Sequence, residues 1–472
     1  MYNGEITKSL QAAGEGMEIQ RRVNGVWRTR WTFILAATGS AVGLGNIWKF
    51  PYIAGENGGG AFVLVYLVCI ALIGVPIMIA EVMLGRRGRM SPINSMLYLA
   101  RESKVSHWWS GIGWSGIFAG VFILSFYSVI AGWALHYMLL ALSGDFQQIT
   151  AETSGALFAE LLSNANALIA WHTLFMLLTL AIVMAGVIKG LGRAITIMMP
   201  VLFGLLLVML VYSAVEGDFA AGWNFMFAFN GSNLEWRSIL VALGHAFFTL
   251  SLGMGAIMAY GAYMPEQKTS IGSTVIMVAL LDTLVALVAG LVIFPIVFAS
   301  PAIEPSAGPG LLFVSLPVAF GSMAAGQIFA FAFFALITLA ALSSAISIIE
   351  PTVAWLVESK HFSRQKVVLY LGGIIWFVGL GTVFSFNIWA DYTFYGKNFF
   401  QSLDFLTANI MMPLGGLCIA LFVGWRMQPS AIIEELGAID QGGYKYWLRL
   451  LRYVSPVLVA IVFVMSLIDK LS

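Results

Sequence analysis

The sequence contains eleven apolar runs that are each long enough to cross the roughly 30 Å hydrocarbon core of a bilayer. They lie at residues 31–53, 59–85, 107–141, 167–187, 191–214, 239–262, 272–299, 322–357, 366–385, 399–424 and 446–469. Only 10% of the chain is Asp, Glu, Lys or Arg, against about 25% in soluble domains, so a water-exposed surface cannot be built. Because helices satisfy their own backbone polar groups in lipid, we predict an all-α polytopic membrane protein with 11 transmembrane helices.

Charge and motif content exclude several other classes. The 24 basic and 23 acidic residues give a net charge of +1, which excludes a basic nucleic-acid binder. Cys69 and Cys418 lie in apolar runs and are too few for a disulfide framework. No Gly-x-Ser-x-Gly, His-Glu-x-x-His or paired catalytic carboxylate occurs in the runs, so we predict that the chain is not an enzyme.

The distribution of basic residues predicts the orientation. The loops at 142–166, 215–238 and 300–321 hold one basic residue, Arg237, and seven acids, whereas the intervening loops are rich in Arg and Lys. The positive-inside rule therefore places a polar N-terminal tail, residues 1–26, in the cytoplasm, and the odd span count places the C-terminus outside. The segment 300–321 is expected to fold back over the protein from outside.

Two of the runs contain glycine clusters at mid-membrane depth, GSAVGLGN at 39–46 and TLSLGMG at 249–255. Each glycine costs roughly 1 kcal/mol in a helix interior relative to alanine. Close helix packing through small residues explains one such cluster. Two clusters, each opening a set of five helices, favour discontinuous helices that face a substrate and a cation.

Three motifs carry a family resemblance: GSAVGLGNIWKFPYIAGENGGGAF (39–62), FFTLSLGMGAI (247–257) and LAALSSAISIIEP (339–351). The chain resembles the neurotransmitter:sodium symporter family (solute carrier 6-like), in particular its bacterial amino-acid transporters with eleven spans. The resemblance implies a five-plus-five inverted-repeat (LeuT-type) fold with helices 1 and 6 unwound, sodium-driven uptake and alternating access. It implies a ten-helix core at 27–425, with repeats at about 27–214 and 239–425, followed by a cytoplasmic loop and eleventh helix at 426–472.

The resemblance also implies two sodium sites. The first matches Ala41, Asn46, Thr249 and Asp282. The second matches the carbonyls of Gly39, Val42 and Ala340 with the hydroxyls of Ser343 and Ser344. Sodium prefers hard oxygen ligands of these kinds, although the two serines could instead bond back to their own helix.

Asp282 departs from the chloride-dependent members of the family. Those proteins carry a neutral Asn at this position and a Ser four residues later, where this chain has Ala286. We expect the carboxylate to supply the negative charge, so that no chloride is needed. A buried carboxylate beside an emptied cation site is also a candidate for taking up a proton, which makes proton counter-movement plausible. The alternative is a structural ion pair with a distant lysine.

The resemblance also implies a substrate site. A substrate carboxylate would meet the half-helix amides near Leu44 and Gly45 and the hydroxyl of Tyr127. Amine-transporting relatives carry Asp where this chain has Gly43, so we expect a neutral, hydrophobic or aromatic L-amino acid. The predicted substrate-binding residues are Ser40, Ala41, Gly43, Leu44, Gly45, Ile123, Tyr127, Phe248, Thr249, Ser251, Met254, Gly255, Ser344 and Ile348.

Two gates are implied by the resemblance. Outside, Lys49 and Asp404 match a basic–acidic pair, with Phe248 as the lid over the substrate and His245 nearby. Lys cannot make the bidentate fork of the more usual Arg. Inside, Trp27 and Glu358 match a latch, but Asn24 stands where its arginine is expected. Arg21, Arg22 and Arg28 are the open alternatives for that arginine.

The leading hypothesis is a sodium-coupled amino-acid importer in a bacterial inner membrane. Its partners would be an amino acid, Na+ (two ions) and the lipid bilayer, with no nucleic acid; the oligomeric state is unknown from the sequence. A proton-driven amino-acid transporter and a non-translocating amino-acid sensor are the alternatives. Uptake that requires sodium would distinguish the sodium-coupled importer from the proton-driven transporter and from the sensor.

Overall fold

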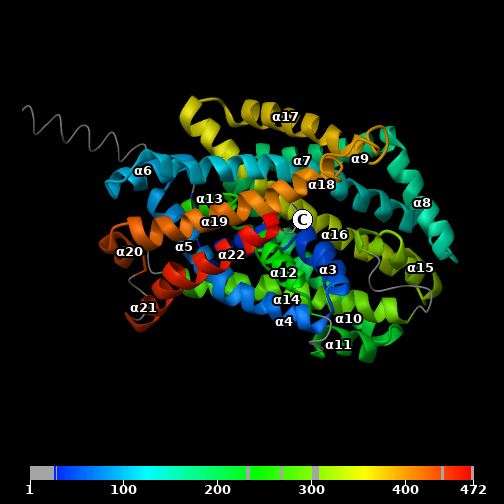
Figure 1. The fold of residues 1–472 in the computed structure, drawn as a ribbon. Coiled ribbons are helices and arrows are strands. Elements are labelled where there is room, and N and C mark those ends of the chain that lie inside the picture. Colours follow the sequence, from blue (N-terminus) through cyan, green and yellow to red (C-terminus); the bar gives the residue numbers. More distant parts are fainter. Residues whose placement is uncertain are drawn as a thin grey trace, which may run out of the picture.

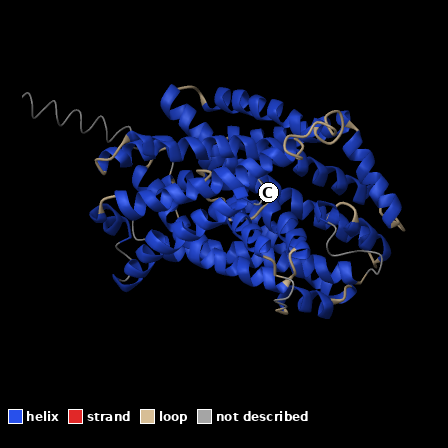
Figure 2. Cartoon of the chain, viewed as in Figure 1, coloured by secondary structure: helices blue, strands red, loops and turns tan. Residues whose placement is uncertain are grey.

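The computed structural model describes residues 26–27, 29–229, 234–265, 269–299, 308–436 and 441–468. Within these ranges the chain is helical apart from turns, loops and one isolated bridge between Phe394 and Lys397 (Figure 2). The prediction of an all-α fold is confirmed.

Nine helical segments of the described chain are long and apolar enough to cross a membrane. They comprise α4 (Gly60–Cys69) with α5 (Val75–Gly88), α7 (Gly111–Ser143), α9 (Ala165–Met184), α10 (Arg193–Glu216), α14 (Ile271–Phe298), α16 (Gly326–Lys360), α17 (Arg364–Phe384), α18 (Phe399–Phe405) with α19 (Met412–Leu421), and α21 (Gln441–Arg449) with α22 (Ser455–Ile468). Large apolar side chains such as Leu207, Val211 and Val215 recur every four residues along an exposed face of α10, as expected where lipid is the solvent. The protein is therefore a multi-pass membrane protein.

The two remaining apolar runs are each divided into short helices. The first consists of α2 (Arg30–Ala41) and, after a short π-helical stretch, α3 (Phe50–Glu56). The second consists of α12 (Trp236–Thr249) and α13 (Ala256–Ala262). The predicted interruptions at 39–46 and 249–255 are both present, and the short helices lie near the middle of the bundle (Figure 1).

Buried polar groups replace the hydrogen bonds that the second interruption loses. Ser251, Gly253 and Gly255 have φ of 55°, 73° and 76°, which breaks the helix because the left-handed region cannot continue it. The amide of Gly253 donates to Oε2 of the fully buried Glu81 on α5 (3.1 Å). A Cβ at Gly253 would lie 2.4 Å from the carbonyl oxygen of Met412, so glycine is required there on two grounds.

Close helix packing positions the interruptions. Helix α16 packs along α7 and also contacts α2, α10 and α13. Glycines of α7 make this approach possible, since a Cβ at Gly120 would lie 3.0 Å from the carbonyl oxygen of Ile348, and one at Gly116 would lie 2.9 Å from the backbone of Met254. The interruptions are thus held against α7 and α16.

Short helices occupy several segments that separate the apolar runs. They are α6 (Pro92–Glu102), α8 (Ala151–Ser163), α11 (Phe219–Phe227), α15 (Ser315–Ser322) and α20 (Pro429–Leu436). The described part of the predicted external segment folds onto α7, where the ring of Phe313 packs on Trp133 (5.6 Å) and Tyr137 (5.2 Å). Residues 300–307 of that segment lie outside the described chain.

Candidate functional site

A small cavity of about 20 Å³ lies between the two interruptions. Its lining consists of Ser40, Ala41, Gly43, Gly45, Ile123, Tyr127, Phe248, Ser251, Met254, Ser344 and Ile348. These eleven residues are all among the fourteen that the sequence predicts for the substrate site. Leu44 lines the neighbouring outer cavity, Thr249 points to Asp282, and Gly255 is the N-cap of α13.

One end of this cavity offers hydrogen-bonding groups for an anion. The amide of Leu44 donates to the hydroxyl of Tyr127 (3.1 Å), at the start of the second half of the first broken helix. A Cβ at Gly43 would lie 2.3 Å from Oγ of Ser344 and 2.7 Å from the Tyr127 hydroxyl. Any side chain at position 43 would therefore displace the polar groups that surround the cavity.

Asp282 on α14 gathers polar side chains from both broken helices. Asn46 donates through Nδ2 to its carboxylate Oδ1 (2.7 Å) and its carbonyl (3.0 Å), and the Thr249 hydroxyl donates to both carboxylate oxygens (3.2 and 3.1 Å). The Asn46 Oδ1 accepts from the Gly43 amide (3.0 Å). A cation bound here would meet a carboxylate, a hydroxyl and, after the amide turns over, the Asn46 oxygen.

A second group of oxygens joins α2 to α16. The Ser343 hydroxyl donates to the carbonyls of Val42 (3.4 Å) and Ala340 (2.9 Å). The Ser344 hydroxyl donates to the carbonyls of Ser40 (3.2 Å) and Val42 (3.1 Å). Both serines thus bond across to the end of α2, and Ser343 also bonds back to its own helix. Gly39, the remaining predicted member, packs against Met199.

Both clusters have the chemistry of sites for a hard cation. Their donors are carbonyls, hydroxyls, an amide and one carboxylate, which are oxygen ligands of the kind that hard cations take. Within the described residues no group of three or more His, Cys, Asp or Glu side chains converges, so nothing resembles a transition-metal site there.

An ion pair covers the cavity on the predicted outer side. The ammonium of Lys49 lies 2.9 and 3.2 Å from the carboxylate oxygens of Asp404 and 4.7 Å from the ring centre of Phe248. His245 does not line the outer cavity that contains Lys49, Asp404 and Phe248. It is buried and packs between Phe50 (5.8 Å) and Tyr66 (5.5 Å).

On the predicted inner side, Trp27 and Glu358 have different partners. Trp27 packs edge-on against Tyr260 (5.2 Å) and Tyr263 (5.6 Å), and its amide donates to the Tyr263 carbonyl (3.0 Å). Both carboxylate oxygens of Glu358 share the amide N–H of Ser91 (3.0 and 2.9 Å), at the start of α6. Asn24 and the candidate arginines at 21, 22 and 28 lie outside the described residues.

A further ionic contact on this side is not anticipated by the family motifs. Arg364, at the start of α17, holds the buried carboxylate of Glu350 with both terminal nitrogens, one at 3.0 Å. The hydroxyl of Tyr263 donates to the same carboxylate (2.9 Å). The only signal in the sequence is an intramembrane Glu near a basic residue that starts the next helix.

Two broken helices that face one cavity, oxygen clusters beside it and a polar closure on each side define a membrane transporter of the inverted-repeat type. The chain matches the sodium:neurotransmitter symporter family over residues 24–154 and 159–472. It therefore belongs to this family of sodium-coupled transporters and is not an enzyme.

Individual proteins support this assignment. The uncharacterized sodium-dependent transporter YhdH of Bacillus subtilis (strain 168) is 37% identical, over 94% of this chain and 98% of its own. The sodium- and chloride-dependent GABA transporter 2 of Rattus norvegicus is 25% identical, over 94% and 80%. The crystal structure of MhsT in complex with L-phenylalanine shares 42% identity, with a TM-score of 0.88 over 94% of this chain and 100% of that one. The LeuT-type fold expected from the motifs is confirmed.

Proposed function

We propose that this protein is a symporter that uses sodium to import neutral L-amino acids with hydrophobic or aromatic side chains. The mixed lining of the central cavity carries the proposal. It combines hydrogen-bonding groups of Tyr127 and the first interruption with apolar side chains, which are Ile123, Phe248, Met254 and Ile348. The complex of MhsT with L-phenylalanine supports this substrate class.

The polar part of the lining suits the backbone of an amino acid. Its carboxylate would accept from the amides near Leu44 and Gly45 at a helix N-terminus and from the Tyr127 hydroxyl. Its ammonium group would face backbone carbonyls of the first interruption. None of the lining residues is acidic, so an amine without a carboxylate would find no counter-charge among them.

Binding requires the cavity to widen. Its 20 Å³ holds little more than one water, so a phenylalanine must displace side chains of the lining. Phe248 is the candidate, because it borders both this cavity and the outer one, and Met254 is adaptable in shape.

Two sodium ions would bind at the oxygen clusters around Asp282 and Ser343. The carboxylate of Asp282 would balance the first ion's charge, so uptake would not need chloride. When that ion leaves, the buried carboxylate would take up a proton, because an unpaired charge in a low-dielectric site is costly. Proton counter-transport would follow.

The proposed placement is a bacterial inner membrane, with the N-terminus in the cytoplasm and the C-terminus outside. The relative from Bacillus subtilis, which this chain matches over 98% of its length, supports the bacterial cell type. The distribution of basic residues supports the orientation. The transport core would be residues 27–425, with the eleventh span in 426–472.

The test uses purified protein in liposomes with an imposed sodium gradient. Labelled L-phenylalanine and L-leucine should accumulate with sodium, not with potassium alone, and equally well in chloride and gluconate. Internal pH should rise as the amino acid accumulates in the wild type, and the rise per amino acid transported should be lost in Asp282→Asn. Uptake driven by a proton gradient without sodium would establish the proton-driven alternative. Sodium-dependent binding without any accumulation would establish the sensor.

A further inference from the structure

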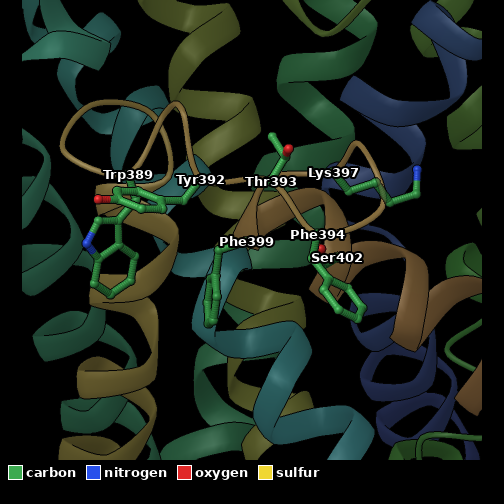
Figure 3. Close-up of a pocket in the computed structure, with 7 residues that line it drawn as sticks. All are labelled: Trp389, Tyr392, Thr393, Phe394, Lys397, Phe399 and Ser402. Carbon is green, nitrogen blue, oxygen red and sulfur yellow. The ribbon is translucent and has the colours of Figure 1, made fainter.

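A second cavity, of about 600 Å³, lies outside the transport site, where the loop after α17 meets α18 (Figure 3). Its lining consists of Trp389, Tyr392, Thr393, Phe394, Lys397, Phe399 and Ser402. Four of these side chains are aromatic, three carry a hydroxyl (Tyr392 is both) and one is cationic. Neither the sodium sites nor the substrate site uses any of them.

The walls of this cavity are held in place by local structure. Phe394 and Lys397 exchange two backbone hydrogen bonds (2.8 and 3.1 Å), and Tyr395 and Gly396 between them have φ of 49° and 71°, which closes a tight turn. Trp389 packs edge-on against Phe399 (6.4 Å). The aromatic surface is therefore fixed by the turn and by α18.

The loop exposes more aromatic surface than a purely aqueous position favours. Tyr392, Phe394 and Tyr395 are 76%, 72% and 86% exposed. The loop joins two apolar helices, so it lies where the bilayer meets water, the depth at which aromatic side chains concentrate. These rings are suited to contact with lipid headgroups.

The charge of the cavity selects the sign of its occupant. Lys397 is its only charged lining residue, and none of the ion pairs seen in the described chain includes it. Its ammonium lies 5.5 Å from the ring centre of Phe405. A second amino-acid molecule would find no acidic group in the lining for its own ammonium, whereas an anion with an apolar body satisfies the cavity.

We propose that this cavity binds an anionic phospholipid of the outer leaflet. The phosphate would contact Lys397 and the hydroxyl of Ser402. An acyl chain would run along Trp389 and Phe399, which point the same way from the loop in Figure 3.

Helix α18 connects this cavity to the outer gate. Phe399 and Ser402 line the lipid cavity, whereas Phe400 and Asp404 of the same helix line the outer cavity beside Lys49. A lipid bound on one face of α18 would hold Asp404 in reach of Lys49 on the other. This consequence rests on the proposed gate; the lipid site itself does not.

Native mass spectrometry after purification in an equimolar mixture of phosphatidylglycerol and phosphatidylcholine tests the site. The wild-type protein should retain phosphatidylglycerol in preference. Lys397→Gln should lower that retention about five-fold, the effect of one basic residue at an anionic surface. Tyr392→Ala should also lower it. The matched controls, Lys360→Gln on the opposite side and Tyr370→Ala on α17, whose side chain is exposed as Tyr392 is, should leave it unchanged.

Equal retention of the two lipids by the wild type, or equal phosphatidylglycerol retention by the wild type and Lys397→Gln, would overturn the proposal. A second outcome would also overturn it: the water-soluble anion 3-phenylpropionate binds to the wild type without displacing lipid, and Lys397→Gln abolishes this binding. The cavity would then be a site for a free carboxylic acid. Equal melting temperatures verify that each variant is folded. Retention is read without transport, so failure of the proposed transport function leaves this result interpretable.

Discussion

Removing the hydroxyl of Tyr263 should favour opening of the inner side. That hydroxyl donates to Oε1 of Glu350 (2.9 Å), which is also held by Arg364. Tyr263 directly follows α13, whereas its two partners belong to α16 and α17. Tyr263→Phe therefore cuts the contact between the broken helix and the ion pair while the pair itself persists.

The size of the effect follows from the burial of the acceptor. Glu350 is fully buried, and a hydrogen bond to a charged group contributes about 1.5–3 kcal/mol. If α13 leaves α16 when the inner side opens, that energy is present only in the closed conformation. Since about 1.4 kcal/mol is a factor of ten, the ratio of inner-open to inner-closed protein should rise at least about ten-fold.

Hydrogen exchange read by mass spectrometry measures this ratio. Backbone amides of Ala256–Ala262 should exchange about ten-fold faster in sodium-free buffer in Tyr263→Phe, and sodium should reduce the difference. The control is Tyr137→Phe on α7, whose buried hydroxyl has no hydrogen-bond partner among the described residues. Equal exchange in the wild type and Tyr263→Phe would refute the reasoning. So would faster exchange spread evenly over all helices, since that reports global destabilisation.

Three other substitutions give separate expectations. Gly43→Ala places a Cβ 2.3 Å from Ser344 Oγ, an overpacking that costs about 1–3 kcal/mol, so sodium-dependent amino-acid binding should weaken at least about five-fold by equilibrium dialysis. Asp282→Asn should lower sodium-driven uptake in gluconate at least about thirty-fold, since truncating one member of a buried charged network costs about 2–5 kcal/mol. Unchanged uptake would show that the Asp282 carboxylate is not part of the first sodium site. Lys49→Gln should raise the dissociation rate of bound amino acid no more than about five-fold, because its pair with Asp404 is partly exposed and such pairs contribute about 0–1 kcal/mol; stopped-flow dilution measures that rate.

The interruptions of the helices could be predicted because their cause is local. Glycine clusters at mid-membrane depth are costly unless the backbone is unwound there, and Gly253 and Gly255 do adopt positive φ. Nine of the eleven residues that line the cavity belong to the three motifs, whereas Ile123 and Tyr127 lie outside them. Those two positions were predicted only through the family resemblance.

The polar contacts between distant segments could not be predicted in the same way. Glu358 bonds to the Ser91 amide across 267 positions of sequence, and nothing in either segment indicates the other. Arg364 reaches Glu350 only because α16 and α17 turn back on each other. The short helix α8 was also missed, since its buried surface consists of two residues, Ser154 and Leu161, too few for an apolar pattern.

The two closures differ in strength, and this difference indicates how sodium would act. Outside, Lys49 and Asp404 are 13% and 31% exposed, so their separation costs little. Inside, Arg364 is 20% exposed, but the carboxylate of Glu350 is fully buried and also accepts from Tyr263, so separating it from its partners costs more. The outer side is therefore the easier one to open without ligand.

Sodium at the proposed second site would bridge Val42 of α2 and Ser343 of α16, which already contact each other (3.4 Å). If the inner side opens by moving α2 and α13 away from α16, bound sodium stabilises the conformation that is closed inside. Sodium would then favour the outward-open conformation, which is the one that binds the amino acid.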